Sequence, residues 1–277
     1  MPHPNRPPAT DMVAFLLGYI PRPVDPFTSQ IVSGLLHSLY NYQKKLLLFG
    51  QSYHGSVDAL YDDLVCSGIE GLIFIPPPNS PLIPKLVDSG LPVVAIADRA
   101  PGLVSVVVDN DMGAFMLAEH LSIRGHRKVM YRKDLYDHES AVRRFIAFNN
   151  AARYLGIEVV PTLAANYMGI LSQEEETLLL APAGERPSAV LSWADIFSYP
   201  VLKFCKQHEL SVPGDIAVTG FDGSPVTIDP ARRLTTVQAP WQRVAEKAVD
   251  LLMQLSRGEE GPREIVFPVD LVIGDTT

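Results

Sequence analysis

The chain is short of cysteine and of long apolar runs, and each shortage excludes a class of protein. Its 277 residues include two cysteines, Cys66 and Cys205, which lie far apart and lack metal-binding or redox spacing. We expect both to be buried thiols in a reducing compartment. The first apolar run, residues 12–18, is too short to span a bilayer, and no secretion signal precedes it. These features predict a cytoplasmic protein with no membrane partner.

The chain also has too few basic residues to bind nucleic acid unaided. It carries 23 Lys and Arg against 31 Asp and Glu, a formal net charge of -8, and has no basic run. Affinity for nucleic acids rests on neutralising backbone phosphates, so an acidic chain of this kind does not hold DNA by itself. Any contact with DNA would have to come from another segment.

The motifs of the common enzyme classes are missing as well. The sequence has no G-x-S-x-G elbow, no H-E-x-x-H, no P-loop and no G-x-G-x-x-G. Its seven histidines are scattered, and His120 and His126 lack the i, i+4 spacing of a metal site. The acidic run 174–176 opens a predicted helix, where negative charge suits the helix dipole. We therefore expect no enzyme activity, no cofactor and no metal.

What the sequence does contain is an alternation of short apolar runs with segments of helical period. The composition, 47% hydrophobic and 19% charged, is that of a globular protein, and the Pro-rich residues 1–10 predict a flexible tail. The predicted strands are 12–18, 45–50, 71–75, 92–97, 104–109, 127–131, 189–193, 215–221, 235–238 and two around Val266 and Val272. The predicted helices are 27–42, 56–67, 82–89, 113–124, 141–155, 172–180, 195–208 and 241–255, with Ser56 as an N-cap and Gly125 and Gly156 as C-terminal stops.

Strands with few polar residues that alternate with helices predict parallel sheets covered on both faces. Two such series in tandem predict an α/β fold with two doubly wound lobes. Open parallel sheets bind ligands at the carboxyl ends of their strands, so the residues that follow strands are the candidates for a site.

Four acidic residues follow predicted strands: Asp98, Asp109, Asp195 and Asp222. Ionised carboxylates accept hydrogen bonds from the hydroxyls of a polyol, and an arginine fork supplies complementary donors. The aromatic rings of Phe27, Trp193 and Phe221 can stack on a sugar or a base. Each residue has a plainer alternative. Asp109 and Asp195 can be helix N-caps, Trp193 and Phe221 can be core, and Arg144 can be a surface side chain.

Several runs resemble those of the LacI/GalR family of bacterial transcription regulators. VSVVVDNDMGAFMLAEHLSIRGHRKVMY (104–131) resembles the family's strand, Asp, Gly, helix, GH(R/K), strand segment. RRFIAFNNAARYLGI (143–157) resembles its R-x-x-G-F helix, with Ala147 in place of the glycine. Residues 187–225 resemble the stretch that ends in VP-x-D and G-(F/Y)-D, and residues 232–259 resemble the LTT strand and the helix after it. The resemblance covers the chain from about Asp11 to its end.

The resemblance implies a type I periplasmic-binding-protein-like fold, in which the chain crosses between two lobes three times. We place the crossings near Arg132, Leu234 and Phe267. The N-terminal lobe is then 11–131 plus 235–266, and the C-terminal lobe is 132–234 plus 267–277. Family members carry a helix-turn-helix before this core, and we expect operator DNA to be bound only through such a domain, which these 277 residues lack. A homodimer is also expected from the family.

Carried over by position, Arg144 resembles the family's effector-clamping arginine and Asp222 its hydroxyl-accepting aspartate. His138 and Ser140 fall where members place polar contacts, while Ala194 replaces an asparagine that sugar-binding members often have. The expected ligand-binding residues are Phe27, Asp98, Asp109, His138, Ser140, Arg144, Trp193, Asp195, Phe221 and Asp222.

The predicted function is the sensing of a small molecule, a sugar or a sugar-like effector, by a LacI-type transcriptional regulator. Ligand would close the lobes and so control DNA binding. One alternative is an extracytoplasmic solute-binding protein of a sugar transporter, which has the same fold but needs a secretion signal. The other is an enzyme on a doubly wound fold, which needs a catalytic group.

Overall fold

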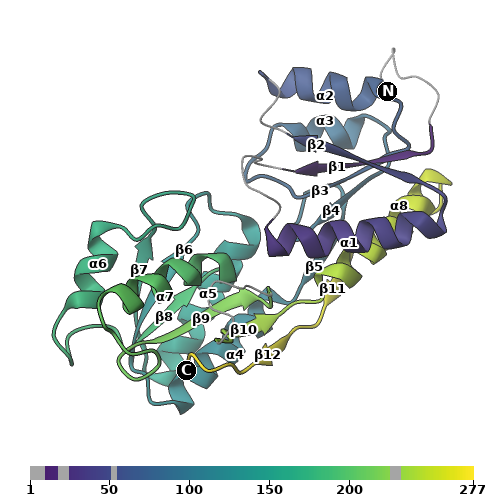
Figure 1. Cartoon of the computed structure of the whole chain (residues 1–277). Helices are drawn as coiled ribbons and strands as arrows, with labels where there is room; N and C mark the ends of the chain where they lie inside the picture. The colour runs from purple at the N-terminus through teal and green to yellow at the C-terminus, as the bar shows by residue number, and fades with distance from the viewer. Residues whose placement is uncertain (1–9, 18–24, 51–54, 225–231) are drawn as a thin grey trace. The chain divides into compact units, whose positions relative to one another are not determined.

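The computed structural model describes residues 10–17, 25–50, 55–224 and 232–277, which form two compact units (Figure 1). Unit 1 comprises the described residues up to Val108 together with Pro240–Phe267. Unit 2 comprises Asp109–Ala239 and Pro268–Thr277. Each unit contains one six-stranded sheet, which confirms the predicted two-lobed α/β fold. Residues 1–9 of the expected tail lie outside the described residues, whereas Thr10 is held by a 2.8 Å hydrogen bond from its amide to the Gly68 carbonyl.

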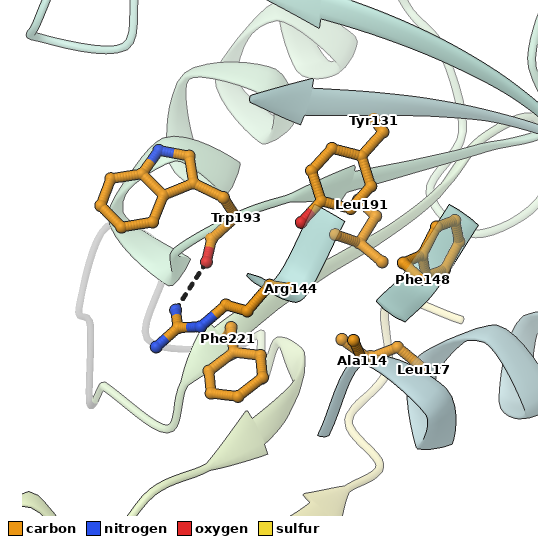
Figure 2. Close-up of a pocket in the computed structure, with 8 residues that line it drawn as sticks. All are labelled: Ala114, Leu117, Tyr131, Arg144, Phe148, Leu191, Trp193 and Phe221. Carbon is orange, nitrogen blue, oxygen red and sulfur yellow. Dashed lines mark hydrogen bonds between the residues drawn. The ribbon is translucent and has the colours of Figure 1, made fainter. Parts of the chain in front are cut away.

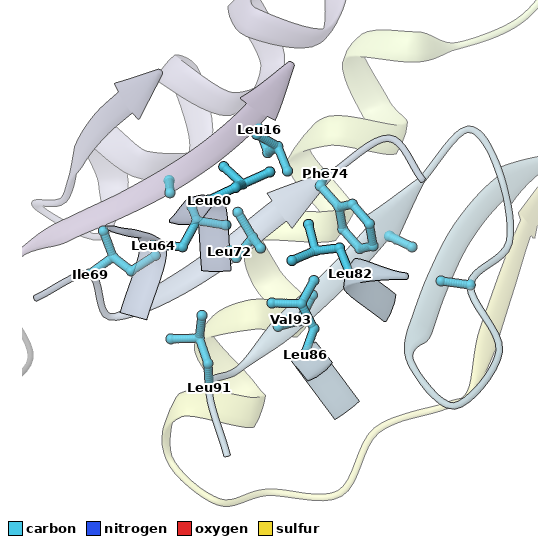
Figure 3. Packing of buried hydrophobic residues seen from close by; sticks show 13 residues of the cluster. Leu16, Leu60, Leu64, Ile69, Leu72, Phe74, Leu82, Leu86, Leu91 and Val93 are labelled. Atoms are coloured by element: carbon cyan, nitrogen blue, oxygen red, sulfur yellow. The ribbon is translucent and has the colours of Figure 1, made fainter. Parts of the chain in front are cut away.

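The sheet of unit 1 is parallel throughout, in the order β11-β5-β4-β3-β1-β2. Its inner strands are buried on both faces, as their runs of Val, Ile, Leu and Phe predict. Helices α2 and α3 cover one face through the apolar cluster drawn in Figure 3, and α8 packs on the sheet together with α1. The strands are β1 Met12–Leu17, β2 Lys45–Gly50, β3 Gly71–Phe74, β4 Val93–Ile96, β5 Val104–Val108 and β11 Glu264–Phe267, and the helices are α1 Pro26–Asn41, α2 Val57–Cys66, α3 Leu82–Asp88 and α8 Trp241–Ser256.

The sheet of unit 2 has the order β12-β10-β9-β8-β6-β7 and is parallel except for β12, which runs antiparallel to β10. Helices α6 and α7 share an apolar cluster with one face of the sheet, and the paired helices α4 and α5 contact its strands as well. The strands are β6 Lys128–Lys133, β7 Glu158–Leu163, β8 Ala189–Ser192, β9 Ala217–Asp222, β10 Thr235–Gln238 and β12 Asp270–Val272, and the helices are α4 Asn110–Ile123, α5 Glu139–Leu155, α6 Gln173–Leu180, the 3-10 helix η2 Asp195–Phe197 and α7 Ser198–Gln207.

Local side-chain chemistry sets the ends of several helices. Ser56 caps α2, as predicted, by accepting a hydrogen bond from the Ala59 amide at 3.1 Å. Gly156 ends α5 with a φ of 70°, a left-handed conformation that glycine adopts without strain. The helix predicted at 113–124 begins earlier, at Asn110, because Asp109 is its N-cap. The helix predicted at 195–208 is divided into η2 and α7.

Two of the three expected crossings lie elsewhere. The first is between residues 108 and 109, not near Arg132, and the second between 239 and 240, not near Leu234. The reason is strand pairing: β6 pairs with β7 and β8, and β10 pairs with β9, so both strands belong to the sheet of unit 2. The third crossing, between 267 and 268, lies where we expected it. Residues 109–131 therefore belong to unit 2.

One strand and the exposure of one thiol differ from the predictions. Strand β7 contains Pro161, which counts against a strand in a sheet centre, but β7 is the edge strand of its sheet, where proline is tolerated. Cys66, at the last turn of α2, is exposed, whereas Cys205 is buried as expected. Among the described residues, no helix has both the length and the apolar character needed to cross a membrane.

Candidate functional site

The side chain of Arg144 is the centre of a polar group in unit 2. It projects from α5 and is only 3% exposed. Its Nε donates to Asn110 Oδ1 at 2.8 Å, and its Nη1 donates to the Trp193 carbonyl at 2.8 Å and to Asp222 Oδ1 at 3.3 Å. The guanidinium also lies 3.6 Å from the centre of the Phe221 ring, in cation–π geometry. Arg144 is therefore a buried, oriented cation and not a surface side chain.

Two aspartates lie at the carboxyl ends of neighbouring strands beside this cation. Asp195, which is fully buried, accepts a hydrogen bond from Thr236 Oγ1 at 2.6 Å and another from the Ser224 amide at 2.7 Å. Burial raises the pKa of Asp195 well above its ordinary value, and the nearby charge of Asp222 adds to the effect. A Cβ on Gly220 would lie 2.2 Å from Asp195 Oδ1, so only glycine fits beneath the carboxylate.

Asp222 itself has a φ of 120°, which residues other than glycine rarely adopt. Strain of this kind persists where the surrounding structure holds it, and it clusters at functional sites. Here the ion pair with Arg144 and a position at the end of β9 hold the residue in place.

The rings of His138, Trp193 and Phe197 lie beside the polar group and form an aromatic wall. The rings of His138 and Trp193 are stacked, with centroids 6.1 Å apart and an interplanar angle of 14°. The centroid of the Phe197 ring lies 5.2 Å from that of Trp193. His138 is fixed by Asp134, whose Oδ2 lies 2.6 Å from Nδ1 and accepts from the His138 amide at 2.9 Å. Burial raises the pKa of Asp134, but the hydrogen bonds and charge of His138 outweigh burial and lower it overall.

Figure 2 shows the residues that line a small pocket, in which Arg144 donates a hydrogen bond to the Trp193 carbonyl. Its walls lie close together in this arrangement. The Tyr131 hydroxyl is buried and has no hydrogen-bond partner among the described residues, and burial raises the pKa of this phenol. The pocket is lined by Ala114, Leu117, Tyr131, Arg144, Phe148, Leu191, Trp193 and Phe221.

Seven of the ten predicted site residues are gathered here at the carboxyl ends of the unit 2 strands or at the start of α5. For Asp109 and Asp195, the structure shows whether each is a helix cap. Asp109 is a helix cap, because its Oδ1 accepts from the Met112 amide at 2.9 Å. Asp195 is not a cap, because its carboxylate accepts from the Thr236 hydroxyl and from the Ser224 amide, which lie outside η2 and α7. Phe221 is both core and site, since it is 1% exposed yet lies directly under Arg144. The seven are His138, Ser140, Arg144, Trp193, Asp195, Phe221 and Asp222.

Of the other three, Asp109 belongs to unit 2, and Phe27 and Asp98 belong to unit 1. Phe27 lies in the first turn of α1 and packs edge-on against Trp241, with ring centroids 4.8 Å apart. Asp98 follows β4 and is 4% exposed. Their role as ligand contacts stays a prediction.

Three residues of the site are not among the ten predicted ligand contacts. Asn110 directly follows Asp109 after a strand, and its orientation is set by Arg144, which can only donate, so the contacted atom is the amide oxygen. Asp134 comes just after β6, so the rule that selects residues after strands finds it once the strand end is known. Tyr131 lies within β6 and reads from sequence as an ordinary core residue.

The fold of the two units is of the periplasmic binding protein type. Residues 118–277, more than half of the chain, match the family described as "Periplasmic binding protein-like domain". The chain belongs to this family and has the effector-binding fold of the LacI/GalR regulators.

Three similar proteins illustrate the relationship. The chain is 25% identical over 236 residues to the "Arabinose metabolism transcriptional repressor" of Geobacillus stearothermophilus, which covers 78% of this chain and 63% of that protein. It is 25% identical over 273 residues to the "HTH-type transcriptional repressor CytR" of Escherichia coli, covering 95% and 79%. A solved "transcriptional regulator CelR-cellobiose complex" superposes with a TM-score of 0.85 at 23% identity, over 100% of this chain and 86% of that one. These relatives are transcriptional regulators and not enzymes.

Proposed function

We propose that this chain is the small-molecule sensing domain of a LacI-type transcriptional regulator, and that the polar group around Arg144 and Asp222 binds the effector. The observation that carries the proposal is that the buried guanidinium of Arg144 has unused hydrogen-bond donors. Within the described part of the chain, Nε and Nη1 make the hydrogen bonds of Arg144, and no residue there accepts from Nη2. A buried guanidinium with unused donors, next to a carboxylate, offers both halves of a hydroxyl-recognition site.

The effector we propose is a sugar or a sugar-like molecule. A hydroxyl can accept from Arg144 and donate to Asp222 at the same time, and the stacked Trp193 and His138 rings suit the apolar face of a sugar or a base. The names of relatives point to the same range of ligands, since one is a repressor of arabinose metabolism and another was solved with cellobiose.

We further propose that ligand acts by favouring one arrangement of the two units. A ligand shifts such an equilibrium only by its differential affinity for the two states, so it would have to contact both units, with Phe27 and Asp98 as the proposed contacts from unit 1. In a homodimeric, cytoplasmic regulator this change would alter operator binding by a helix-turn-helix domain. On this proposal the chain has no catalytic activity.

A thermal-shift screen tests the proposal. Pentoses, hexoses, disaccharides including cellobiose, nucleosides and purine bases are tested against the chain, because a ligand that binds only the folded form raises the melting temperature. The screen is repeated with Arg144→Ala and with Asp222→Ala. The proposal expects a compound whose shift both substitutions abolish. A shift that survives both substitutions, or no shift with any compound, would count against it.

A further inference from the structure

A second arginine of unit 2, Arg132, is buried without solvent contact on the sheet face opposite Arg144. Arg132 and Tyr131 are neighbours on β6, so their side chains point to opposite faces. Arg132 and Glu175 are both 0% exposed and form a two-bond ion pair, from Nε to Oε1 at 2.7 Å and from Nη2 to Oε2 at 3.0 Å. Two further donors of Arg132 reach backbone carbonyls, Nη2 that of Gly169 at 3.0 Å and Nη1 that of Phe197.

The carboxylate of Glu175 is saturated with donors as well. Oε1 accepts from Thr162 Oγ1 at 2.9 Å, and Oε2 accepts from the Ser172 amide at 2.9 Å, which completes a capping box at the start of α6. The network therefore joins β6, β7, the loop 164–172 and the end of η2. All of these segments belong to unit 2.

The network contacts the aromatic wall of the candidate site at Phe197. Phe197, whose carbonyl Arg132 holds, packs against Trp193, and the Trp193 amide donates to the Arg132 carbonyl at 3.1 Å. The loop presses on the same ring, since a Cβ on Gly169 would lie 2.7 Å from Phe197 Cδ1. Contacts on the far face of the sheet are thus linked, through Phe197, to Trp193, whose own carbonyl accepts from Arg144.

A purely stabilising role does not account for this pair. Taking two charges out of water is expensive, and well-packed apolar residues of the same size often stabilise a protein as well or better. What an apolar pair cannot supply is the planar arginine fork, which binds a carboxylate and two carbonyls in a fixed geometry. We propose that Arg132 and Glu175 are positioning residues that fix Phe197, and through it Trp193, in the candidate site. The link to effector binding rests on the proposed function, but the effect on Trp193 does not.

Quenching of Trp193 fluorescence by acrylamide tests the proposal without any ligand. The chain has two tryptophans, so the measurement uses a Trp241→Phe background, in which Trp193 is the only tryptophan, and excites tryptophan selectively. In the double variant Arg132→Met, Glu175→Leu, apolar side chains replace the pair without leaving an unpaired charge. We expect the Stern–Volmer constant to rise about twofold, because Trp193 loses its packing partner on one face, and the emission maximum to move to longer wavelength.

Two further variants keep the result interpretable. Arg186→Met breaks a different ion pair of unit 2, with Asp215, and is expected to leave Trp193 quenching unchanged. Arg132→Lys keeps the charge but loses the fork, and is expected to raise quenching in a protein that keeps its circular dichroism spectrum. The proposal is overturned if the folded double variant has the parent's quenching constant, or if Arg186→Met raises it equally. If the double variant does not fold, Arg132→Lys decides between the same two outcomes. A failed ligand screen would leave this result unaffected.

Discussion

Replacing Arg144 by methionine tests the role of the buried cation in unit 2. Methionine keeps an unbranched apolar stem at this position but removes the charge over the Phe221 ring and three hydrogen bonds. The loss leaves the carboxylate of Asp222 buried without its cation. Removing one partner of a buried ion pair costs about 3–5 kcal/mol. We expect a loss near the lower value, because Asp222 is not fully enclosed.

The expected change in melting temperature follows from the size of the unit. Unit 2 has about 140 residues, so at about 2.1 cal/mol/K per residue its unfolding entropy is about 0.3 kcal/mol/K. A loss of about 3 kcal/mol therefore lowers the melting temperature of this unit by about 10 °C. A second substitution, Asp222→Asn, removes the uncompensated charge, so the double variant should be more stable than the sum of the single effects predicts, by about 1–2 kcal/mol.

Urea denaturation followed by circular dichroism measures these differences. The matched control is Arg143→Met, the neighbouring arginine on the same helix, whose side chain is 38% exposed and whose ion pairs with Asp111 and Glu139 lie at the surface. An exposed pair of this kind contributes about 0–1 kcal/mol. The reasoning is refuted if Arg144→Met costs no more than Arg143→Met, or if the effects of Arg144→Met and Asp222→Asn are additive.

Three other predictions concern titration and thiol reactivity. The raised pKa of Asp195 means that the folded state keeps a proton that the unfolded state loses, so this group destabilises the fold as pH rises above the ordinary aspartate pKa. Asp195→Asn should therefore raise the melting temperature more at pH 8 than at pH 4; a pH-independent effect would contradict this. The lowered pKa of Asp134 stabilises the fold above the ordinary aspartate pKa, and this contribution is lost as pH falls through the lower, folded value. Asp134→Asn should accordingly flatten the decline of the unfolding free energy in acid, and an unchanged decline would argue against it. Finally, Cys66 is exposed, while burial raises the pKa of Cys205 to about 11. One thiol equivalent should react with Ellman's reagent in the folded chain and a second only after denaturation; two equivalents in the folded chain would be the contrary result.

Much of the fold could be predicted from local patterns. The buried strands are nearly continuous runs of Val, Ile, Leu and Phe, and α8, with its apolar positions at helical spacing, was predicted to within one residue. The sheet to which a strand belongs is not local information. Strand β6 reads the same whether it pairs with β1 or with β8, and for this reason the first crossing was misplaced. Strand β7 was missed because its Pro161 is acceptable only at an edge.

The site could be predicted only in part, because only some of its residues are marked by a local pattern. Residues after strands are found by rule, and Arg144 and Asp222 were found by position in a resembling family. Whether Asp109 caps a helix or faces a ligand depends on where α4 begins, which the sequence left open. The Arg132–Glu175 pair joins residues 43 positions apart, on β6 and α6, and no spacing pattern in the sequence predicts it.

Hydrogen–deuterium exchange, with and without the compound that gives the largest melting shift in the screen, tests the central claim most directly. The claim is that effector binds at the carboxyl ends of the unit 2 strands, around Arg144 and Asp222. Ligand should slow exchange in residues 139–144, 193–197 and 221–224 together, because these segments carry the proposed contacts. Protection confined to other segments, with these three unchanged, would show that the effector binds elsewhere.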